Sequence, residues 1–248
     1  MQIFKHILLF VFSFYLTALS VTAVADSGEL TIVTDDGPPH MIKRSDSGID
    51  IDIARDVLRL AGYETKVTYA PLGRASMMVK DKQADVVIPT FLDSDSKLFM
   101  SEPFIQYRPT VFTLADSNIN LQSLDDLKGL RICTFQGATG YFGTKFSANA
   151  SGPMYREMHD MSKLPSMLFK GRADVVVLDY YIFHYYAKQN IDDYNRQLVV
   201  SNAIIPEVNA YAGFHDPAVR DAFNRALLQY QAESRDLEVI ESYIGNAH

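Results

Sequence analysis

The sequence predicts an α/β protein built from two similar lobes, and two internal repeats carry this prediction. The segment KQADVVIPT at residues 82–90 returns as GRADVVVLD at residues 171–179, so that two Ala-Asp pairs, 89 residues apart, each enter a β-branched run. The pattern L-x-I-x-T occurs at residues 30–34 and again at residues 130–134. A single match is ordinary in any α/β chain, whereas two matches in the same order favour a duplicated unit.

The first unit reads as alternating strands and helices. Strands are predicted at residues 30–34, 65–70 and 85–90, and helices at residues 51–62 and 74–82. Alternation of this kind favours mostly parallel sheets, in which ligands bind beyond the carboxyl ends of the strands.

The second unit repeats this order after a connecting segment that contains TVFTLAD. A strand, two helices and a further strand are predicted at residues 130–134, 138–148, 165–170 and 174–179. The residues that follow the strands of both units should face a cleft between the lobes, the commonest place for a small-molecule site. These residues are Asp35, Asp36, His40, Pro89, Thr90, Gln136 to Thr139, Asp179 and Tyr180.

Residues 1–25 have the features of a secretory signal peptide. Lys5 provides a basic start, an apolar run begins at about Ile7, and Ala23-Val24-Ala25 forms a small-x-small cleavage site. A membrane anchor is the alternative, but the segment is short for one and polar, acidic residues follow it. The sequence therefore predicts a periplasmic protein.

Charge and cysteine content argue against a nucleic-acid-binding protein and against a fold held by disulfides. Removal of residues 1–25 takes away Lys5, which leaves 22 basic residues against 30 acidic ones and a net charge of −8. Nucleic acid is not an expected partner, because phosphate binding needs a basic surface. The single cysteine, Cys133, lies in a predicted strand and has no partner for an intramolecular disulfide, so the stability of the fold must come from apolar cores.

A series of motifs resembles the family 3 extracellular solute-binding proteins, the periplasmic receptors for polar amino acids and related compounds. Each motif is modestly specific, but together their order and spacing cover nearly all of the mature chain. They are LTIVTDDGPPHM, GIDIDIARDVLRLAG, KQADVVIPT, MSEPF, LDDLKGLRICTFQGATG, GRADVVVLD and DPAVRDAFNRALLQY.

The resemblance implies a type II periplasmic-binding fold with two α/β lobes joined by two hinge strands. Lobe 1 would comprise residues 26–113 and 212–248, and lobe 2 residues 114–211. The helix predicted from Asp216 would return to lobe 1.

The resemblance also implies a function. A monomeric receptor without a cofactor would close around a small polar ligand, either an amino acid or an amine-bearing compound, and deliver it to an ABC permease. One alternative is a membrane sensor as the partner, and another is a dehydratase-like enzyme using Asp179, Asp36 or His40 as acid or base. A metal site at Asp35, Asp36 and His40 is disfavoured, because no second His or Cys is spaced to complete it.

Relatives that bind amino acids suggest where the ligand charges are held. They carry a T-x-E-R-type segment whose Arg clamps the ligand carboxylate through a bidentate fork. The matching stretch, residues 91–104, contains no Arg and has only Lys97 as a base. An acidic group of the ligand would then be held by Lys97, by Arg74 or by lobe 2 amides near Gly137 to Thr139. Asp179 falls where these receptors place the carboxylate that meets a ligand ammonium. Gly137 and Thr139 fall where lobe 2 meets an anionic group.

Four more residues are expected at the ligand, and some have a second interpretation. Asp36 and Thr90 directly follow strands. Arg74 would replace the missing positive charge, or it is a solvated residue at a helix start. His40 would stack on the ligand in place of an aromatic residue, or it is exposed. Asp179 itself would receive an amine, or it only caps the helix that follows.

We predict that the mature protein begins at Asp26, because cleavage after Ala25 matches the small-x-small pattern. The intact mass of protein recovered from the periplasm measures this directly. Retention of residues 1–25 in the membrane fraction would contradict the prediction.

Overall fold

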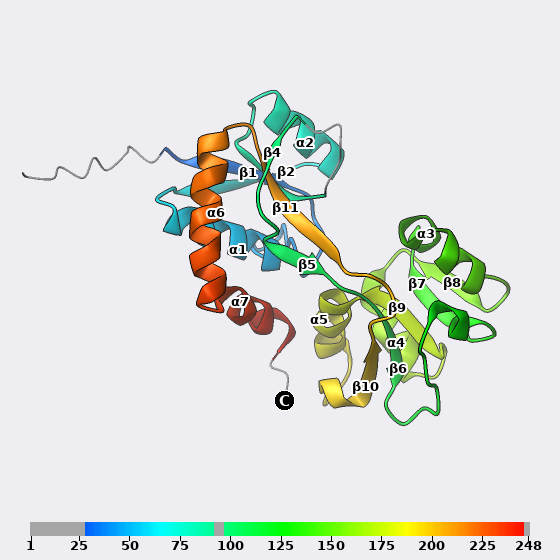
Figure 1. Cartoon of the computed structure of the whole chain (residues 1–248). Coiled ribbons are helices and arrows are strands. Elements are labelled where there is room, and N and C mark those ends of the chain that lie inside the picture. The colour runs from blue at the N-terminus through cyan, green and yellow to red at the C-terminus, as the bar shows by residue number, and fades with distance from the viewer. Residues whose placement is uncertain (1–27, 92–96, 246–248) are drawn as a thin grey trace, which may run out of the picture.

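The computed structural model describes residues 28–91 and 97–245, which form two α/β lobes, each with its own sheet (Figure 1). The expected signal segment, residues 1–25, lies outside the described residues. No helix in the described ranges has the length and apolar character needed to cross a membrane.

The first lobe is built from both ends of the described chain. Its helices are α1 (Ile49–Leu60), α2 (Leu72–Lys80), α6 (Pro217–Ala232) and α7 (Arg235–Ile244). Its strands are β1 (Leu30–Thr34), β2 (Thr65–Tyr69), β3 (Val86–Thr90), β4 (Phe99–Met100), β5 (Ile105–Tyr107) and β11 (Val208–Phe214). The sheet order is β2-β1-β3-β11-β4, with β5 paired to β11.

The second lobe is continuous in sequence. Its helices are α3 (Ala138–Asn149), α4 (Leu164–Phe169) and α5 (Tyr180–Asn190). Its strands are β6 (Pro109–Leu114), β7 (Ile132–Phe135), β8 (Tyr155–Met158), β9 (Val175–Asp179) and β10 (Val199–Asn202), in the order β10-β6-β9-β7-β8.

The two sheets share one arrangement, which confirms the duplication predicted from the repeats. In lobe 1, β1 runs parallel to β2 and β3, and β11 joins β3 antiparallel. In lobe 2, β7 runs parallel to β8 and β9, and β6 joins β9 antiparallel. The predicted equivalent strands, β3 and β9, therefore occupy equivalent places.

The Ala-Asp pair of each repeat makes the same contact in both lobes. Asp85 Oδ2 accepts a hydrogen bond from the backbone N–H of Thr31 at 2.7 Å, and Asp174 Oδ2 accepts one from Arg131 at 2.7 Å. Each aspartate thus ties the turn before one strand (β3 or β9) to the start of the neighbouring parallel strand (β1 or β7). This structural role explains why the repeat retains an aspartate.

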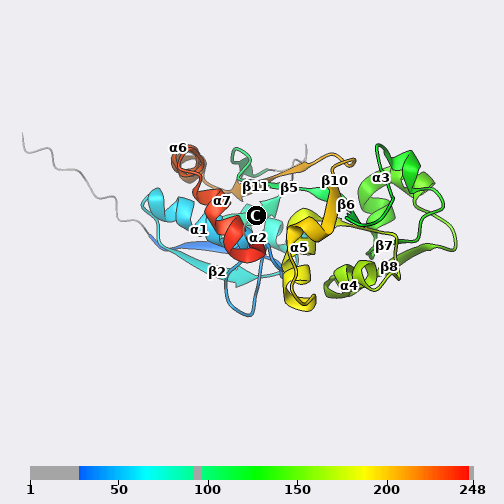
Figure 2. The ribbon, with the colours of Figure 1, turned by 90° about the horizontal axis from the view of Figure 1, so that it is seen from below.

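The chain crosses between the sheets twice, once at Arg108 between β5 and β6 and once at residues 203–207 between β10 and β11 (Figures 1 and 2). The expected lobe boundaries, after residues 113 and 211, fall inside β6 and β11, a few residues beyond these crossings. Strand pairing assigns each of these strands whole to one lobe, since β6 bonds to β9 and β10 of the second sheet and β11 bonds to β3 of the first.

Helix α1 shows how the core of lobe 1 is formed. Its apolar residues recur at helical spacing, and Ile53, Ala54, Val57 and Leu58 are fully buried. Each fully buried aliphatic side chain contributes roughly 1.5–3 kcal/mol of transfer free energy. Both α1 and α2 begin and end two residues earlier than the sequence predicts, and α1 starts directly after Gly48, whose φ of 136° is not helical.

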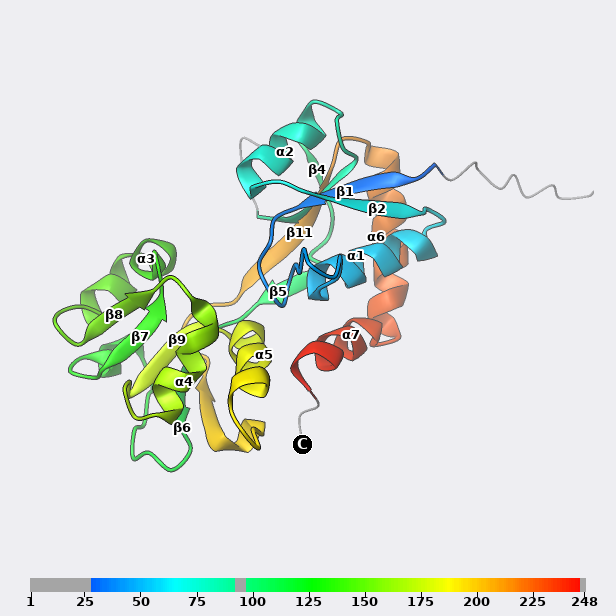
Figure 3. The same cartoon turned by 180° about the vertical axis from the view of Figure 1, so that it is seen from behind.

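The lobes also meet beside the crossings. Helix α5 of lobe 2 packs against α7 of lobe 1 (Figure 3), and Arg196 Nη2 donates a hydrogen bond to the carbonyl of Gly245. The C-terminal segment therefore contacts both lobes.

We predict that Gly48→Ala is strongly destabilising. Gly48 has a φ of +136°, and a Cβ added there would lie 2.4 Å from the carbonyl oxygen of His40. Strain and overpacking together should lower the free energy of unfolding by about 3 kcal/mol or more. Gly62→Ala is the matched control, because its φ is +93° but no atom lies within 4 Å of the added Cβ. Its cost should be about 1–2 kcal/mol. Urea unfolding measures both, and equal losses would refute the role of the close approach.

Candidate ligand-binding site

The loop between β1 and α1 turns His40 into the protein interior. Gly37 and Met41 exchange two backbone hydrogen bonds, of 2.8 and 3.1 Å, which close the loop around His40. Asp36 is exposed, and its Oδ1 accepts a hydrogen bond from the backbone N–H of Lys43 at 3.1 Å. The carboxylate of Asp36 thus stabilises the loop locally.

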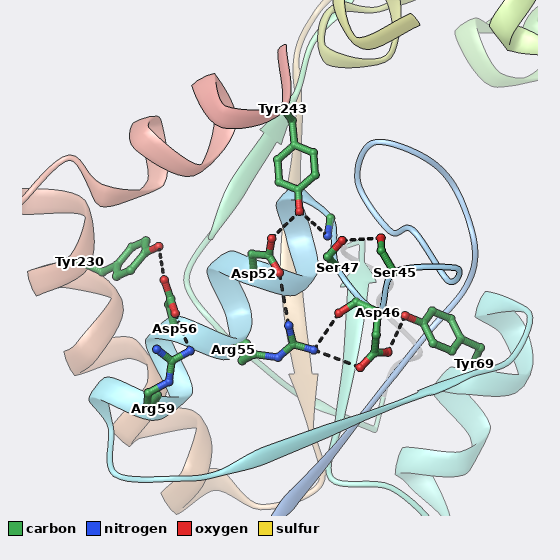
Figure 4. A network of polar contacts seen from close by, with 11 residues as sticks. Ser45, Asp46, Ser47, Asp52, Arg55, Asp56, Arg59, Tyr69, Tyr230 and Tyr243 are labelled. Atoms are coloured by element: carbon green, nitrogen blue, oxygen red, sulfur yellow. Dashed lines mark hydrogen bonds and ion pairs between the residues drawn. The ribbon is translucent and has the colours of Figure 1, made fainter. Parts of the chain in front are cut away.

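Polar contacts hold this loop against helices α1 and α7 (Figure 4). Arg55 donates a hydrogen bond to the carbonyl of Asp46 at 3.0 Å and pairs with Asp52 at 3.3 Å. The Tyr243 hydroxyl accepts a hydrogen bond from the backbone N–H of Gly48 at 2.8 Å and donates one to Asp52. The position of the loop therefore depends on residues near both ends of lobe 1.

His40 lies between two carboxylates, one from each lobe. Its Nδ1 is 2.7 Å from Asp50 Oδ1, on α1, and its Nε2 is 3.3 Å from Asp179 Oδ1, at the end of β9. All three residues are buried, with His40 1% exposed. Burial by itself would lower the pKa of His40, but the two carboxylates raise it to about 10. An imidazolium that donates from both nitrogens fits this environment.

Tyr107 joins this cluster from the strand that leads into the first crossing. Its ring stacks on the imidazole of His40 with a centroid separation of 4.0 Å. Its hydroxyl donates a hydrogen bond to Asp50 Oδ2 at 2.7 Å. Both oxygens of Asp50 therefore face donors, and the cluster reaches from α1 through the hinge to β9.

Asp179 is also the N-cap of α5, as one interpretation of the sequence allowed. Its Oδ1 accepts hydrogen bonds from the backbone N–H groups of Tyr181 and Ile182 at 2.9 and 3.2 Å, and its Oδ2 accepts one from Arg108 at 2.7 Å. Burial would raise the pKa of Asp179, but His40 and these N–H groups lower it. The carboxylate is consequently ionised at neutral pH.

Two adjoining cavities lie beside this cluster. One, of about 240 Å³, is lined mainly by apolar and aromatic side chains, and Asp179 is the only charged residue among its described lining residues. The other, of about 350 Å³, has no charged residue in its described lining and includes Phe91 of lobe 1. Pro109, Tyr141 and Phe142 line both cavities. These two cavities are thus mainly apolar and aromatic, and Asp179 is the one carboxylate among their described lining residues.

The N-terminus of α3 is occupied by a carboxylate of the protein itself. Glu157 Oε2 accepts a hydrogen bond from the backbone N–H of Gly137 at 2.9 Å, and its Oε1 lies 3.4 Å from both the N–H and the hydroxyl of Thr139. Tyr155 donates its hydroxyl proton to Glu157 Oε1 at 2.6 Å. These donors, led by the Gly137 N–H, lower the pKa of Glu157.

The structure brings some of the predicted site residues together and leaves others apart. His40 contacts Asp179, and Gly137 and Thr139 meet at Glu157. In the part of the chain that the structure describes, no hydrogen bond or ion pair joins the remaining predicted residues to either group. Arg74 and Lys97 are exposed and Thr90 is half-buried.

Three residues of the site were missed by sequence reasoning, namely Asp50, Tyr107 and Glu157. Asp50 directly precedes the predicted helix at residues 51–62 and stands four positions before the buried Ala54, and a carboxylate at this apolar spacing was a usable indication for it. Nothing local distinguishes Tyr107 or Glu157, because Tyr107 bonds to Asp50, 57 residues away, and Glu157 to the start of α3, 20 residues away. Among residues 28–91 and 97–245, no three His, Cys, Asp or Glu side chains are grouped to hold a metal ion.

Known proteins share both sequence and fold with this chain, although no family model matches it. The arginine-binding extracellular protein ArtP of Bacillus subtilis (strain 168) is 25% identical over 237 residues, which is 92% of each chain. This similarity to an arginine-binding extracellular protein agrees with the resemblance to the solute-binding receptors noted in the sequence.

Solved structures agree at the level of the fold. The unliganded, open L-cystine solute receptor of Neisseria gonorrhoeae superimposes with a TM-score of 0.70 at 19% identity, covering 90% of this chain and 96% of that one. An ancestral cationic amino acid solute-binding protein, AncCDT-1, gives a TM-score of 0.72 at 20% identity, covering 88% and 96%. The two-lobed α/β fold expected for the family is therefore present.

We predict that His40 stays protonated up to about pH 10, because two buried carboxylates stabilise its charge. His184 on α5 is the internal contrast, since burial and then Arg196 and Arg108 lower its pKa to about 3. Nitrogen chemical shifts of the two imidazole rings, followed by NMR against pH, measure both. A His40 ring that deprotonates near pH 6.5, the ordinary value, would contradict the prediction.

The same pKa shift has a consequence for stability. Since the folded pKa of His40 lies above its unfolded value, its stabilisation is complete below pH 6.5 and is lost as the pH rises through about 10. Between these limits the free energy of unfolding should fall by up to about 1.4 kcal/mol per pH unit relative to His40→Gln.

Proposed function

We propose that this protein is a periplasmic solute-binding receptor. It captures a small amino acid or amine-bearing compound between its lobes and delivers it to an ABC permease. The observation that carries this proposal is the ionised carboxylate of Asp179 in the lining of an aromatic cavity next to the crossings between the lobes. Its relatives support the class of ligand, since their names refer to arginine, cystine and cationic amino acids.

The charge of the buried cluster favours a cationic group. Asp50 and Asp179 place two carboxylates against the single imidazolium of His40, which leaves one negative charge without a counter-ion in the cluster. An uncompensated buried charge is costly, so a ligand ammonium near Asp179 would be stabilised there. Tyr107 and Tyr141 also line this cavity, and an aromatic ring contributes cation–π attraction of about 0.5–2 kcal/mol where its face meets an ammonium.

Hinge closure is the mechanism that fits two lobes joined by two crossings. A ligand shifts the population towards a closed form only through contacts that it makes better there. Two charge-assisted hydrogen bonds of about 1.5–3 kcal/mol each, together with aromatic contacts, are consistent with micromolar affinity, near −8 kcal/mol.

Two features support a periplasmic location. Residues 1–25 have the pattern of a secretory signal peptide, and the name of the relative ArtP describes that protein as extracellular.

We favour a receptor over an enzyme. AncCDT-1, which has a similar fold, is an ancestral amino acid-binding protein and a precursor of cyclohexadienyl dehydratase. An enzyme has therefore arisen from a binding protein of this fold. In this chain, however, both ring nitrogens of His40 already face carboxylates in the interior, which leaves neither free for proton transfer to a ligand. A bound compound should be recovered unchanged, whereas conversion to product would favour the enzyme.

We predict that an amine-bearing ligand, identified by a thermal-shift screen, closes the lobes. We also predict that its affinity depends on the carboxylate of Asp179. Small-angle scattering should show a smaller radius of gyration at saturation. Asp179→Asn should weaken binding by about 1.5–3 kcal/mol, or roughly tenfold to a hundredfold, because the charge is lost while Asn still caps α5.

Asp174→Asn is the matched control. Asp174 is an aspartate of the same lobe that bonds to the backbone of Arg131, and it does not line either cavity. Its ligand affinity should equal that of the wild type. An unchanged radius of gyration at saturation, or equal losses in both variants, would contradict the proposed mode of binding.

A further inference from the structure

Three aromatic rings of lobe 2 line the cavity that contains Asp179. Phe135, Tyr141 and Phe142 contact one another edge to face, with ring centroids 5.7, 5.5 and 5.1 Å apart. Phe142 also packs edge to face on the fully buried Phe146, at 4.8 Å. This aromatic wall is therefore anchored in the core of lobe 2, so its rings lose little freedom when a ligand contacts them.

Tyr141 is the exposed member of this wall. Its side chain lines both cavities, yet the residue is 53% exposed. Within residues 28–91 and 97–245, its hydroxyl forms no hydrogen bond. A large aromatic ring that stays open to solvent beside two cavities is available for contact with a ligand.

The second cavity, of about 350 Å³, has walls from both lobes. Phe91 and Val208 belong to lobe 1, whereas Tyr141 and Phe142 belong to lobe 2. The ring of Phe91 is itself held edge to face by Tyr107, with centroids 5.8 Å apart. A ligand body in this cavity touches both lobes, so it can favour a closed form through contacts that improve on closure.

The described walls offer few polar side-chain groups to such a body. Besides the carboxylate of Asp179 they provide the hydroxyls of Tyr107 and Tyr141, and Tyr107 already donates its proton to Asp50. A guanidinium group carries five N–H donors and a second ammonium carries three. Buried against these walls, either group would lack acceptors, and a buried charge without partners is costly. An aromatic ring has no such requirement and matches the edge-to-face packing of the wall.

We infer that the ligand is an amine whose body is an aromatic ring rather than a second charged group, and that Tyr141 is a specificity-determining residue for this body. Asp179 receives the amine, and the ring lies against Tyr141 in the cavities that it lines. This inference rests on the proposed receptor function and narrows its ligand class.

The first test compares probes that differ in the body. Calorimetry measures the affinity of the wild type for phenethylamine against agmatine, and for phenylalanine against arginine. We expect the aromatic member of each pair to bind at least about tenfold more tightly, because burial of a ring is favourable and burial of an unpaired guanidinium is not. Equal or tighter binding of agmatine and arginine would overturn the inference, as would the absence of saturable binding by both aromatic probes.

The second test examines Tyr141 itself. Tyr141→Ala should weaken phenethylamine binding by about tenfold, because the ring that contacts the ligand is lost. Tyr141→Phe keeps the ring and should bind as the wild type does. Phe99→Ala is the matched control, because Phe99 is a 41% exposed aromatic residue that lines neither cavity. Unchanged affinity in Tyr141→Ala, or an equal loss in Phe99→Ala, would show that Tyr141 does not select the ligand.

Two further measurements separate this inference from the proposed function. Nuclear Overhauser contacts between the ring protons of phenethylamine and those of Tyr141 locate the probe whether or not the lobes close, and the radius of gyration reports closure. Contacts without closure would support the ligand class and count against the receptor mechanism. Closure by arginine, with no binding of phenethylamine or phenylalanine, would leave the receptor in place and overturn the inference.

Discussion

The arrangement around the site depends on one buried imidazolium held between carboxylates of both lobes. His40 comes from the first loop of lobe 1, Asp50 from α1, and Asp179 from the end of β9 in lobe 2. Removing one partner of a buried ion pair typically costs about 3–5 kcal/mol, because the other charge is left without compensation. The loop contacts of Figure 4, the close approach at Gly48 and the stacking of Tyr107 all fix the position of this one ring.

The carboxylates at the cavity edge and at the start of α3 are already engaged within the protein. Asp179 accepts hydrogen bonds from three backbone N–H groups and His40, and Glu157 accepts from the start of α3. Preorganised groups of this kind lose little entropy when a ligand arrives. They also limit what can bind, since a ligand must complement charges whose positions and partners are fixed.

Sequence reasoning recovered what is encoded locally and missed what depends on distant partners. The repeats located β1, β3 and β9, because β-branched runs with defined edges are local patterns. Strands β4 and β5 have only two and three residues, too few for any periodicity, and TVFTLAD was read as a connection although most of it lies in β6. The same limit applies to the site. Asp179 was found from its place after a strand, whereas the pairing of His40 with Asp179, 139 residues apart, has no local pattern.

The position of β11 has a consequence for how the chain folds as it is synthesised from its N-terminus. Lobe 2 spans β6 to β10 without interruption, so all of its strands are present once residue 202 has emerged. Lobe 1 cannot be completed at that stage, because β11 lies between β3 and β4 and supplies the only link between them in the sheet. Until residues 208–214 arrive, β3 exposes an unpaired edge with a buried-type apolar sequence, which is a template for wrong pairing with another chain. The lobe that begins first in the sequence is therefore the one that finishes last, and its early strands need protection in the interval.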